Sequence, residues 1–154
     1  MKKKVLPISV VCATHNGQKK LPILINSIYN NTCWPAEVII CGTKNSDFKF
    51  INNSKFNKLK IKKLISKIKN QKSQRDLAIK NTKYEIIAQC DDDLELDKDY
   101  LKKSFKHFYN KGKIKKIVSA AILFKNLKHQ AIRWNNAYYS FKIYRLILLT
   151  FNYF

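Results

Sequence analysis

Acidic side chains are scarce in this sequence of 154 residues, which has 10 Asp and Glu against 31 Lys and Arg. The formal net charge of +21 favours anionic partners, such as nucleotide phosphates, nucleic acid or the anionic face of a membrane. Arginine is also rare, whereas nucleic-acid surfaces favour it for its planar, bidentate donors. The abundant Lys, Asn and Ile fit a general compositional bias equally well. We therefore do not expect nucleic acid as the partner.

Cysteines at metal-binding spacing are missing as well. The chain has 4 cysteines, Cys12, Cys33, Cys41 and Cys90, and no CxxC pair. Most of them fall in or at the end of predicted buried strands. We expect small core side chains in a reducing compartment rather than a zinc site or a disulfide framework. This usage predicts a cytoplasmic protein.

Long apolar runs are absent too. No stretch reaches the ~20 apolar residues that a membrane-spanning helix needs. The basic N-terminus is followed by an apolar run that breaks at Thr14, so we expect no signal peptide. With 45% apolar residues, the chain is long enough for one domain with a hydrophobic core. We expect a globular protein, either soluble or peripheral at the inner membrane face.

Two kinds of apolar pattern alternate along the chain. Runs rich in β-branched residues predict strands, and apolar positions three or four apart predict helices. Strands are expected over Val5–Ala13, Glu37–Cys41, 59–65, Tyr84–Gln89 and Ile117–Phe124, and helices over 21–31, Ser73–Lys80 and 99–109. A turn is expected at Trp34–Pro35, and Ser73 is the expected N-cap of the second helix. The alternation predicts an α/β domain with a mainly parallel sheet flanked by helices.

The predicted α/β domain spans residues 1–125, and an aromatic, basic C-terminal segment spans residues 126–154. Within that segment, Ile143–Leu149 could pack as a helix in the core or in an oligomer. Alternatively, the segment could lie on a membrane surface, where Tyr and Trp favour the interface and Lys favours anionic lipid.

The few acidic residues are concentrated in one place, because 6 of the 10 lie between Asp91 and Asp99. Clustered like charges repel one another unless a cation relieves them, which suggests a metal site. In an extended chain Asp91 and Asp93 would project to the same side and could share one hard divalent ion. A solvated loop before a helix would explain the same acids. A calcium loop is excluded, because Leu96 and Lys102 stand where that loop needs Gly and Glu.

Four segments carry a resemblance to a known family. They are Ile8–Asn16, Glu37–Ile40, Gln74–Ala78, and Cys90–Asp93 followed by Asp97 and Asp99–Leu101. In this order and spacing they resemble the family 2 glycosyltransferases, which have the GT-A (Rossmann-like) fold, over residues 5–110. The resemblance implies a site for a nucleoside diphosphate sugar, with a UDP-sugar favoured, across the C-terminal strand ends. It also implies a divalent cation, Mn²⁺ or Mg²⁺, and transfer to a saccharide or lipid-linked acceptor.

The resemblance further implies a nucleoside-binding turn and a basic contact. Thr14, His15 and Asn16 match the family's nucleoside-contacting turn, with His15 in the place of the usual tyrosine. Arg75 matches the Arg-Asn segment that meets the base or a phosphate. Without the resemblance, Thr14, His15 and Asn16 could simply end a strand, and Arg75 could be an ordinary surface arginine.

For the acidic motif, the resemblance implies a division of roles. Asp91 and Asp92 match the ribose and base side of the nucleotide site. Asp93 matches the metal ligand that holds the diphosphate, and Asp91 is a second candidate ligand. The metal would stabilise the charge that develops on the leaving nucleoside diphosphate.

Two departures from the family pattern stand out. The family's second strand commonly ends in an Asp that reads the base, whereas Cys41–Thr43 occupy that place here, so the nucleotide stays open. Inverting members use a downstream carboxylate as base, but no Asp or Glu follows Asp99, and His107 and His129 fit ordinary surface positions. The catalytic residue is therefore unassigned.

The acceptor motif of processive members is matched by Gln130–Trp134, but this match follows the acidic motif at a shorter distance in the sequence than it does in the family. The chain also fits a truncated or inactive basic module that binds anionic lipid or nucleic acid.

Overall fold

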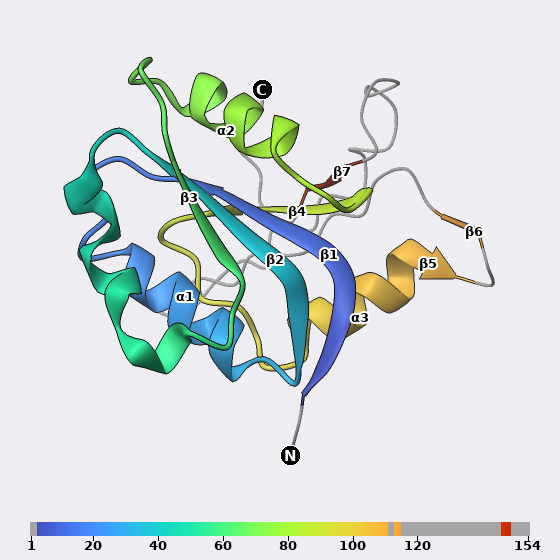
Figure 1. Cartoon of the computed structure of the whole chain (residues 1–154). Coiled ribbons are helices and arrows are strands. Elements are labelled where there is room, and N and C mark those ends of the chain that lie inside the picture. The colour runs from blue at the N-terminus through green and yellow to red at the C-terminus, as the bar shows by residue number, and fades with distance from the viewer. Residues whose placement is uncertain (1–2, 111–112, 115–145, 149–154) are drawn as a thin grey trace, which may run out of the picture.

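The computed structural model describes residues 3–110, 113–114 and 146–148 of the chain. These residues form a parallel sheet in the strand order β3-β2-β1-β4-β7, with helices on both faces, and a short antiparallel pair β5-β6 (Figure 1). The predicted α/β class with a mainly parallel sheet is confirmed. The elements are β1 (Lys4–Ala13), α1 (Leu21–Asn30), β2 (Cys33–Gly42), the 3₁₀ segments η1 (Asn45–Asn52) and η2 (Ser54–Phe56), β3 (Ile61–Ile65), α2 (Gln71–Lys80), β4 (Ile86–Asp91), α3 (Tyr100–Phe108), β5 (Tyr109–Asn110), β6 (Lys113–Ile114) and β7 (Leu146–Leu148).

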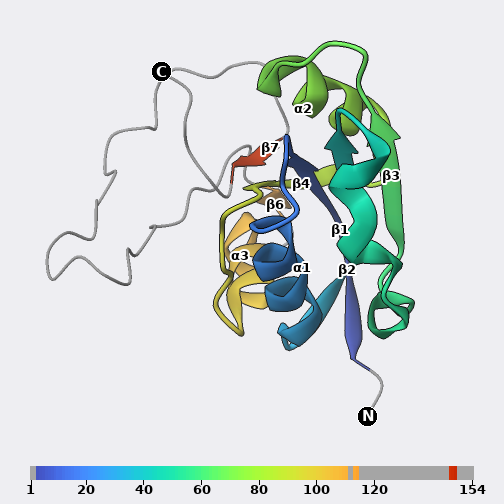
Figure 2. The same cartoon turned by 90° about the vertical axis from the view of Figure 1, so that its left-hand side faces the viewer.

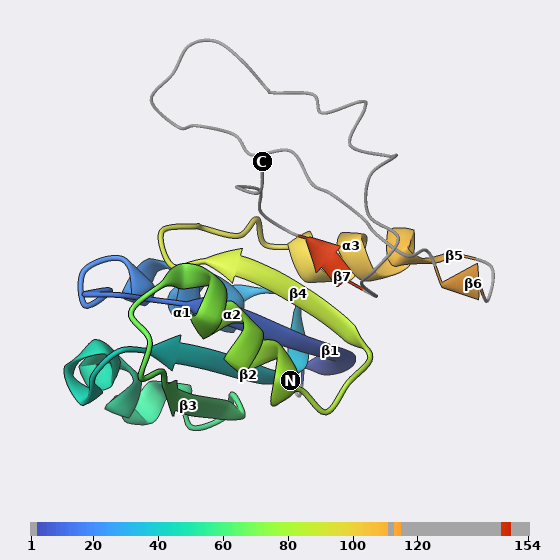
Figure 3. The same cartoon turned by 90° about the horizontal axis from the view of Figure 1, so that it is seen from above.

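Two apolar clusters lie on opposite faces of the sheet. The larger one joins alternate residues of β1, β2 and β4 to α1, to the 3₁₀ segments and to Leu101 of α3. The smaller one joins the other face of the same strands to Ala78 of α2. Figure 3 shows α2 on the near side of the strands, with α1 and α3 behind them. Because both faces are covered, the central strands are near-continuous apolar runs, as the sequence suggested.

Most predicted elements are confirmed. The structure contains the first strand, the first helix, the strand near residues 59–65 and the helix near residues 99–109, each with bounds close to those expected. All four cysteines are buried and free, in keeping with their predicted role as core side chains. The 3₁₀ segments were not predicted, because an Asn- and Lys-rich stretch becomes ordered there by burying Phe48, Ile51 and Phe56.

The turn predicted at Trp34–Pro35 is wrong, because both residues belong to β2. Pro35 lies opposite Leu6, and the ladder shifts register between Leu6 and Ser9. Such a bulge tolerates proline, which has no N–H to give to a ladder. The indole Nε1 of Trp34 donates a hydrogen bond to the backbone oxygen of Tyr29 (2.9 Å), which fastens the start of the strand to the end of α1.

Two element boundaries also differ from the expectation. Helix α2 begins at Gln71, because Asn70 rather than Ser73 is its N-cap, and the Asn70 side chain accepts a hydrogen bond from the Ser73 N–H (2.7 Å). Strand β4 extends through Asp91, which pairs with Ala13 of β1. The first acid of the cluster is therefore held by the sheet rather than by a loop.

Part of the C-terminal segment adds a strand. Leu146–Leu148 form β7, which pairs with β4 (Figure 2), so the helix predicted over Ile143–Leu149 is wrong for these residues. The strand predicted over Ile117–Phe124 and the rest of residues 126–154 lie outside the described residues. Within the described ranges, no helix is both long and apolar enough to cross a bilayer.

Asn31 fastens the acidic segment to the end of α1. Its fully buried amide Nδ2 donates to backbone oxygens in α1 and at Asp97 (3.0 and 3.1 Å), and its Oδ1 accepts from the Leu101 N–H (3.2 Å). The Leu101 N–H belongs to the first turn of α3, where backbone donors lack helical partners. The hydroxyl of Thr32 adds a hydrogen bond to Asp99 Oδ1 (2.8 Å). These bonds fix the chain that follows the acids.

We predict that Asn31→Ala lowers the free energy of unfolding by about 2–4 kcal/mol, because it leaves buried backbone groups without partners. The neighbouring Asn30→Ala is the matched control, since Asn30 is exposed, and it should change stability by less than about 0.5 kcal/mol. Urea denaturation of both variants measures the difference. Equal effects would contradict this role of Asn31.

Candidate functional site

The C-terminal ends of β1, β2 and β4 meet at one edge of the sheet, which is where open α/β sheets bind ligands. The Thr14 N–H donates to the Cys41 carbonyl (2.9 Å). From α2, the buried amide of Gln74 donates to the backbone oxygens of Thr14 and Cys41 (2.7 and 3.0 Å). One glutamine therefore locks the ends of two strands together and seats α2 against this edge.

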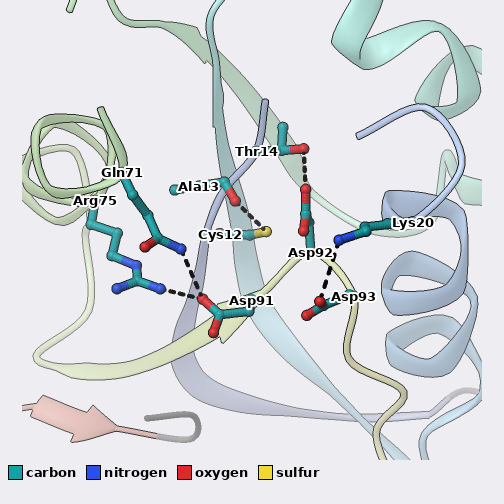
Figure 4. Close-up of polar contacts among 9 residues, drawn as sticks. All are labelled: Cys12, Ala13, Thr14, Lys20, Gln71, Arg75, Asp91, Asp92 and Asp93. Carbon is teal, nitrogen blue, oxygen red and sulfur yellow. Dashed lines mark hydrogen bonds and ion pairs between the residues drawn. The ribbon is translucent and has the colours of Figure 1, made fainter. Parts of the chain in front are cut away.

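The Asp91 carboxylate compensates the positive charge of the buried Arg75. Arg75 Nη2 on α2 donates to Asp91 Oδ1, with side-chain exposures of 2% for Arg75 and 18% for Asp91 (Figure 4). Gln71 Nε2 donates to the same oxygen at 3.4 Å. Gln71 and Arg75 lie one helical turn apart, so they present their donors on the same side of α2. The guanidinium charge is thus paired and its position defined.

Asp92 faces the opposite way, toward β1. The Thr14 hydroxyl donates to Asp92 Oδ2 at 2.6 Å, which joins residues 78 positions apart in the sequence. Burial raises the pKa of the Asp92 carboxyl, and the Thr14 hydrogen bond partly offsets that rise. A Cβ at Gly17 would lie 1.8 Å from Thr14 Oγ1 and 3.0 Å from Asp92 Oδ2. Gly17 therefore leaves room for this contact to form.

Asp93 is the most accessible of the three acids. Its side chain is 56% exposed and lies 3.5 Å from the Lys20 ammonium, which is 61% exposed, and such surface pairs are weak. The chain is not extended here, because the Leu94 N–H donates to the Asp91 carbonyl (3.3 Å). Asp91 and Asp93 therefore contact different elements, instead of projecting together as an extended chain would require.

His15 and Asn16 lie on the exposed side of this edge. His15 Nδ1 is 2.9 Å from Thr43 Oγ1, and Asn16 adopts a φ of 54°, which asparagine tolerates better than most residues. The Thr43 N–H and hydroxyl donate to Asp47 Oδ2 (2.9 and 3.2 Å), and Asp47 is buried. A Cβ at Gly42 would meet Phe48 Cζ at 2.8 Å. The end of β2 thus presents a threonine hydroxyl next to His15.

Several residues that contact the candidate site residues were not identified from the sequence. Gln71 was placed outside the predicted helix by the wrong N-cap, although its spacing to Arg75 is helical. Gln74 was part of a recognised segment but had no assigned role. Lys20 and Asp47 carry no local signal, because their contacts depend on the tertiary fold.

The thiols near this edge are not reactive groups. Cys12 and Cys90 are register partners on β1 and β4. Burial raises the pKa of the Cys90 thiol to about 12 and also raises the pKa of Cys12. Both thiols stay protonated at neutral pH, so they act neither as nucleophiles nor as thiolate ligands.

The acids suit a hard divalent cation, because carboxylate oxygens are the ligands that Mg²⁺ and Mn²⁺ prefer. In the part of the chain that the structure describes, no three side chains of metal-binding type converge on one point. Mg²⁺ is commonly held by one or two carboxylates together with substrate phosphates. The exposed Asp93 fits that mode, and Asp91 could add only the oxygen that does not face Arg75.

Comparisons with known proteins identify the family and the fold of this chain. A family model described as "Glycosyl transferase family 2" matches residues 9–152. The crystal structure of S. aureus TarS 1-349 has a TM-score of 0.62 and 21% identity, over 76% of this chain and 36% of that one. The structure of its complex with UDP has a TM-score of 0.62 and 20% identity, over 81% of this chain and 38% of that one. The structure of its complex with UDP-GlcNAc has a TM-score of 0.60 and 20% identity, over 81% of this chain and 37% of that one. No curated protein sequence matches the chain.

At these identities the TarS structures show the fold alone, which is the expected GT-A type. The chain spans only 36–38% of the length of TarS 1-349. The family model, in contrast, covers residues 9–152, which is most of the chain. The chain belongs to glycosyl transferase family 2.

Proposed function

We propose that the chain binds a nucleoside diphosphate sugar, with a UDP-sugar favoured, and a divalent cation at the C-terminal edge of β1, β2 and β4. The observation that carries this proposal is the Thr14–Asp92 hydrogen bond (2.6 Å), which brings the nucleoside turn and the acidic motif to one place. The TarS structures that hold UDP and UDP-GlcNAc support this choice of donor. The reaction is transfer of a hexosyl group to a saccharide or lipid-linked acceptor.

In this proposal the nucleoside lies between the ends of β1 and β2 and the start of α2. His15 and Asn16 are the exposed polar groups of the turn, and His15 also contacts Thr43 (2.9 Å). The Thr43 hydroxyl donates to Asp47 and can still accept a hydrogen bond, and an imidazole can donate or accept, so this pair can read a base edge. Arg75 orients Asp91, and the ribose and base lie next to Asp91 on the α2 side and Asp92 on the β1 side.

The diphosphate lies toward Asp93 and Lys20. The cation, Mn²⁺ or Mg²⁺, would be held by Asp93, with Asp91 as a second candidate ligand through the oxygen that does not face Arg75, and would stabilise the charge that develops on the leaving diphosphate. The Lys20 ammonium is held only by a weak exposed pair with Asp93 (3.5 Å), so it can turn to a phosphate oxygen. No side chain is assigned here as the catalytic base.

We predict that Asp93→Asn weakens Mn²⁺ binding in the presence of UDP by about tenfold or more, because the amide keeps the shape but removes the charge. The electron paramagnetic resonance signal of free Mn²⁺ measures the bound fraction. Asp97→Asn is the matched control, since Asp97 is exposed and contacts Lys103 and the Asp99 N–H. Wild-type affinity in Asp93→Asn, or an equal loss in both variants, would refute this assignment.

We predict that Arg75→Gln weakens UDP binding in Mn²⁺ by about tenfold or more, because Asp91 loses its charged partner and its fixed orientation. Lys80→Gln removes the same charge from an exposed position on the same helix and should leave affinity unchanged. Titration calorimetry measures both variants, after circular dichroism has shown that they are folded. The assignment fails if a folded Arg75→Gln binds UDP as tightly as Lys80→Gln does.

A further inference from the structure

A basic segment borders the proposed donor site. Residues 58–72, which we call the lysine segment, cover β3, the turn after it and the start of α2. They contain 7 lysines, Lys58, Lys60, Lys62, Lys63, Lys67, Lys69 and Lys72, and all of these side chains are exposed. No acidic residue occurs between Asp47 and Asp76. The segment itself therefore carries seven positive charges and no negative one.

The contacts of two of these lysines leave that charge intact. The Lys62 ammonium donates to Asn81 Oδ1 (2.8 Å), and the Lys63 ammonium donates to Asn52 Oδ1. Both acceptors are neutral amides. Hydrogen bonds to neutral partners position an ammonium group but do not cancel its field.

Exposed apolar side chains lie within the same segment. Ile65 is 47% exposed and Ile68 is 59% exposed, which places them among the few large apolar side chains on the described surface. The turn that presents them is fixed: the buried Ser66 donates its N–H to the Gly42 carbonyl (2.9 Å), and its hydroxyl donates to the Ile68 carbonyl (2.8 Å). The two isoleucines are thus held outward between Lys63 and Lys69.

The turn projects from the sheet beside the donor edge (Figures 1 and 3). Its anchor, Gly42, is the last residue of β2, and the chain beyond the turn enters α2, which carries Gln71 and Arg75. A surface that receives this turn therefore also faces the edge where Asp91 lies.

We propose that the lysine segment docks on an anionic lipid bilayer, with Ile65 and Ile68 inserted at the boundary between headgroups and acyl chains. Lysines attract anionic headgroups, and the apolar side chains between them lose water in the boundary region. A nucleic-acid backbone would satisfy the lysines but would leave both isoleucines in water. The segment also contains no arginine, the residue best suited to bidentate phosphate contacts.

Docking would place the donor edge at the bilayer surface, where a lipid-linked acceptor would be found. That consequence rests on the proposed function, whereas docking itself does not. Bilayer binding and UDP binding are therefore measured separately on the same variants.

The test is flotation of the full chain with phosphatidylglycerol vesicles and with phosphatidylcholine vesicles. We expect wild type to float with the anionic vesicles only. Lys67→Gln/Lys69→Gln should weaken this binding roughly tenfold or more at low salt. Ile65→Ser/Ile68→Ser should weaken it roughly tenfold at the same low salt, although this variant removes no charge. Lys102→Gln/Lys106→Gln, which removes the same charge from exposed positions on α3, should bind like wild type.

The docking proposal is overturned if both segment variants float like wild type, since another part of the chain would then hold the membrane. It is also overturned if wild type ignores anionic vesicles, or if the segment variants lose only duplex DNA binding. All substitutions are at exposed positions, and circular dichroism verifies the fold. UDP titration of the segment variants should match wild type, so a loss of flotation with intact UDP binding identifies the docking surface itself.

Discussion

The site is organised by the buried ion pair between Arg75 and Asp91. A guanidinium that is 2% exposed has lost most of its hydration, so it requires a compensating carboxylate. Asp91 supplies that charge from the last position of β4 and Arg75 reaches it from α2, so the pair joins the sheet to the helix that covers it. Because Asp91 is committed to Arg75, Asp92 and Asp93 are left to face other elements. The three consecutive acids therefore differ in burial, in partner and in proposed role.

At this edge, buried side chains fix the backbone, and a different set of side chains is exposed to solvent. Gln74 bonds the ends of β1 and β2, and Asn31 fixes the segment that follows the acids, so the backbone positions are set by buried hydrogen bonds. Asp93, Lys20 and His15, in contrast, are exposed. Such an arrangement suits a site that holds a ligand in a defined place while leaving its charged groups free to exchange partners. The lysine segment adds a fixed, outward-facing turn beside the same edge.

The sequence predicted the α/β class and most elements because buried strands and amphipathic helices have distinct periods. It failed where tertiary contacts decide the local structure. Trp34 and Pro35 looked like a turn, yet a bulge and the bond to Tyr29 keep them in β2. Asn70 and Ser73 are both good caps, and only the fold selects Asn70. The acids were found from their clustering, and Thr14 and Arg75 from the family resemblance. The contacts that join them were not predicted, because Thr14 and Lys20 lie more than 70 positions away from the acids in the sequence.

The central claim is that this edge binds a nucleoside diphosphate together with a divalent cation. Titration calorimetry of the wild-type chain with UDP and with uridine, in Mn²⁺ and again in EDTA, tests it most directly. The account predicts that UDP binds in Mn²⁺, that EDTA weakens this binding by about tenfold or more, and that uridine binds much more weakly, because the diphosphate completes the coordination of the ion. Undetectable UDP binding in Mn²⁺, or equal affinities with and without the metal, would contradict it.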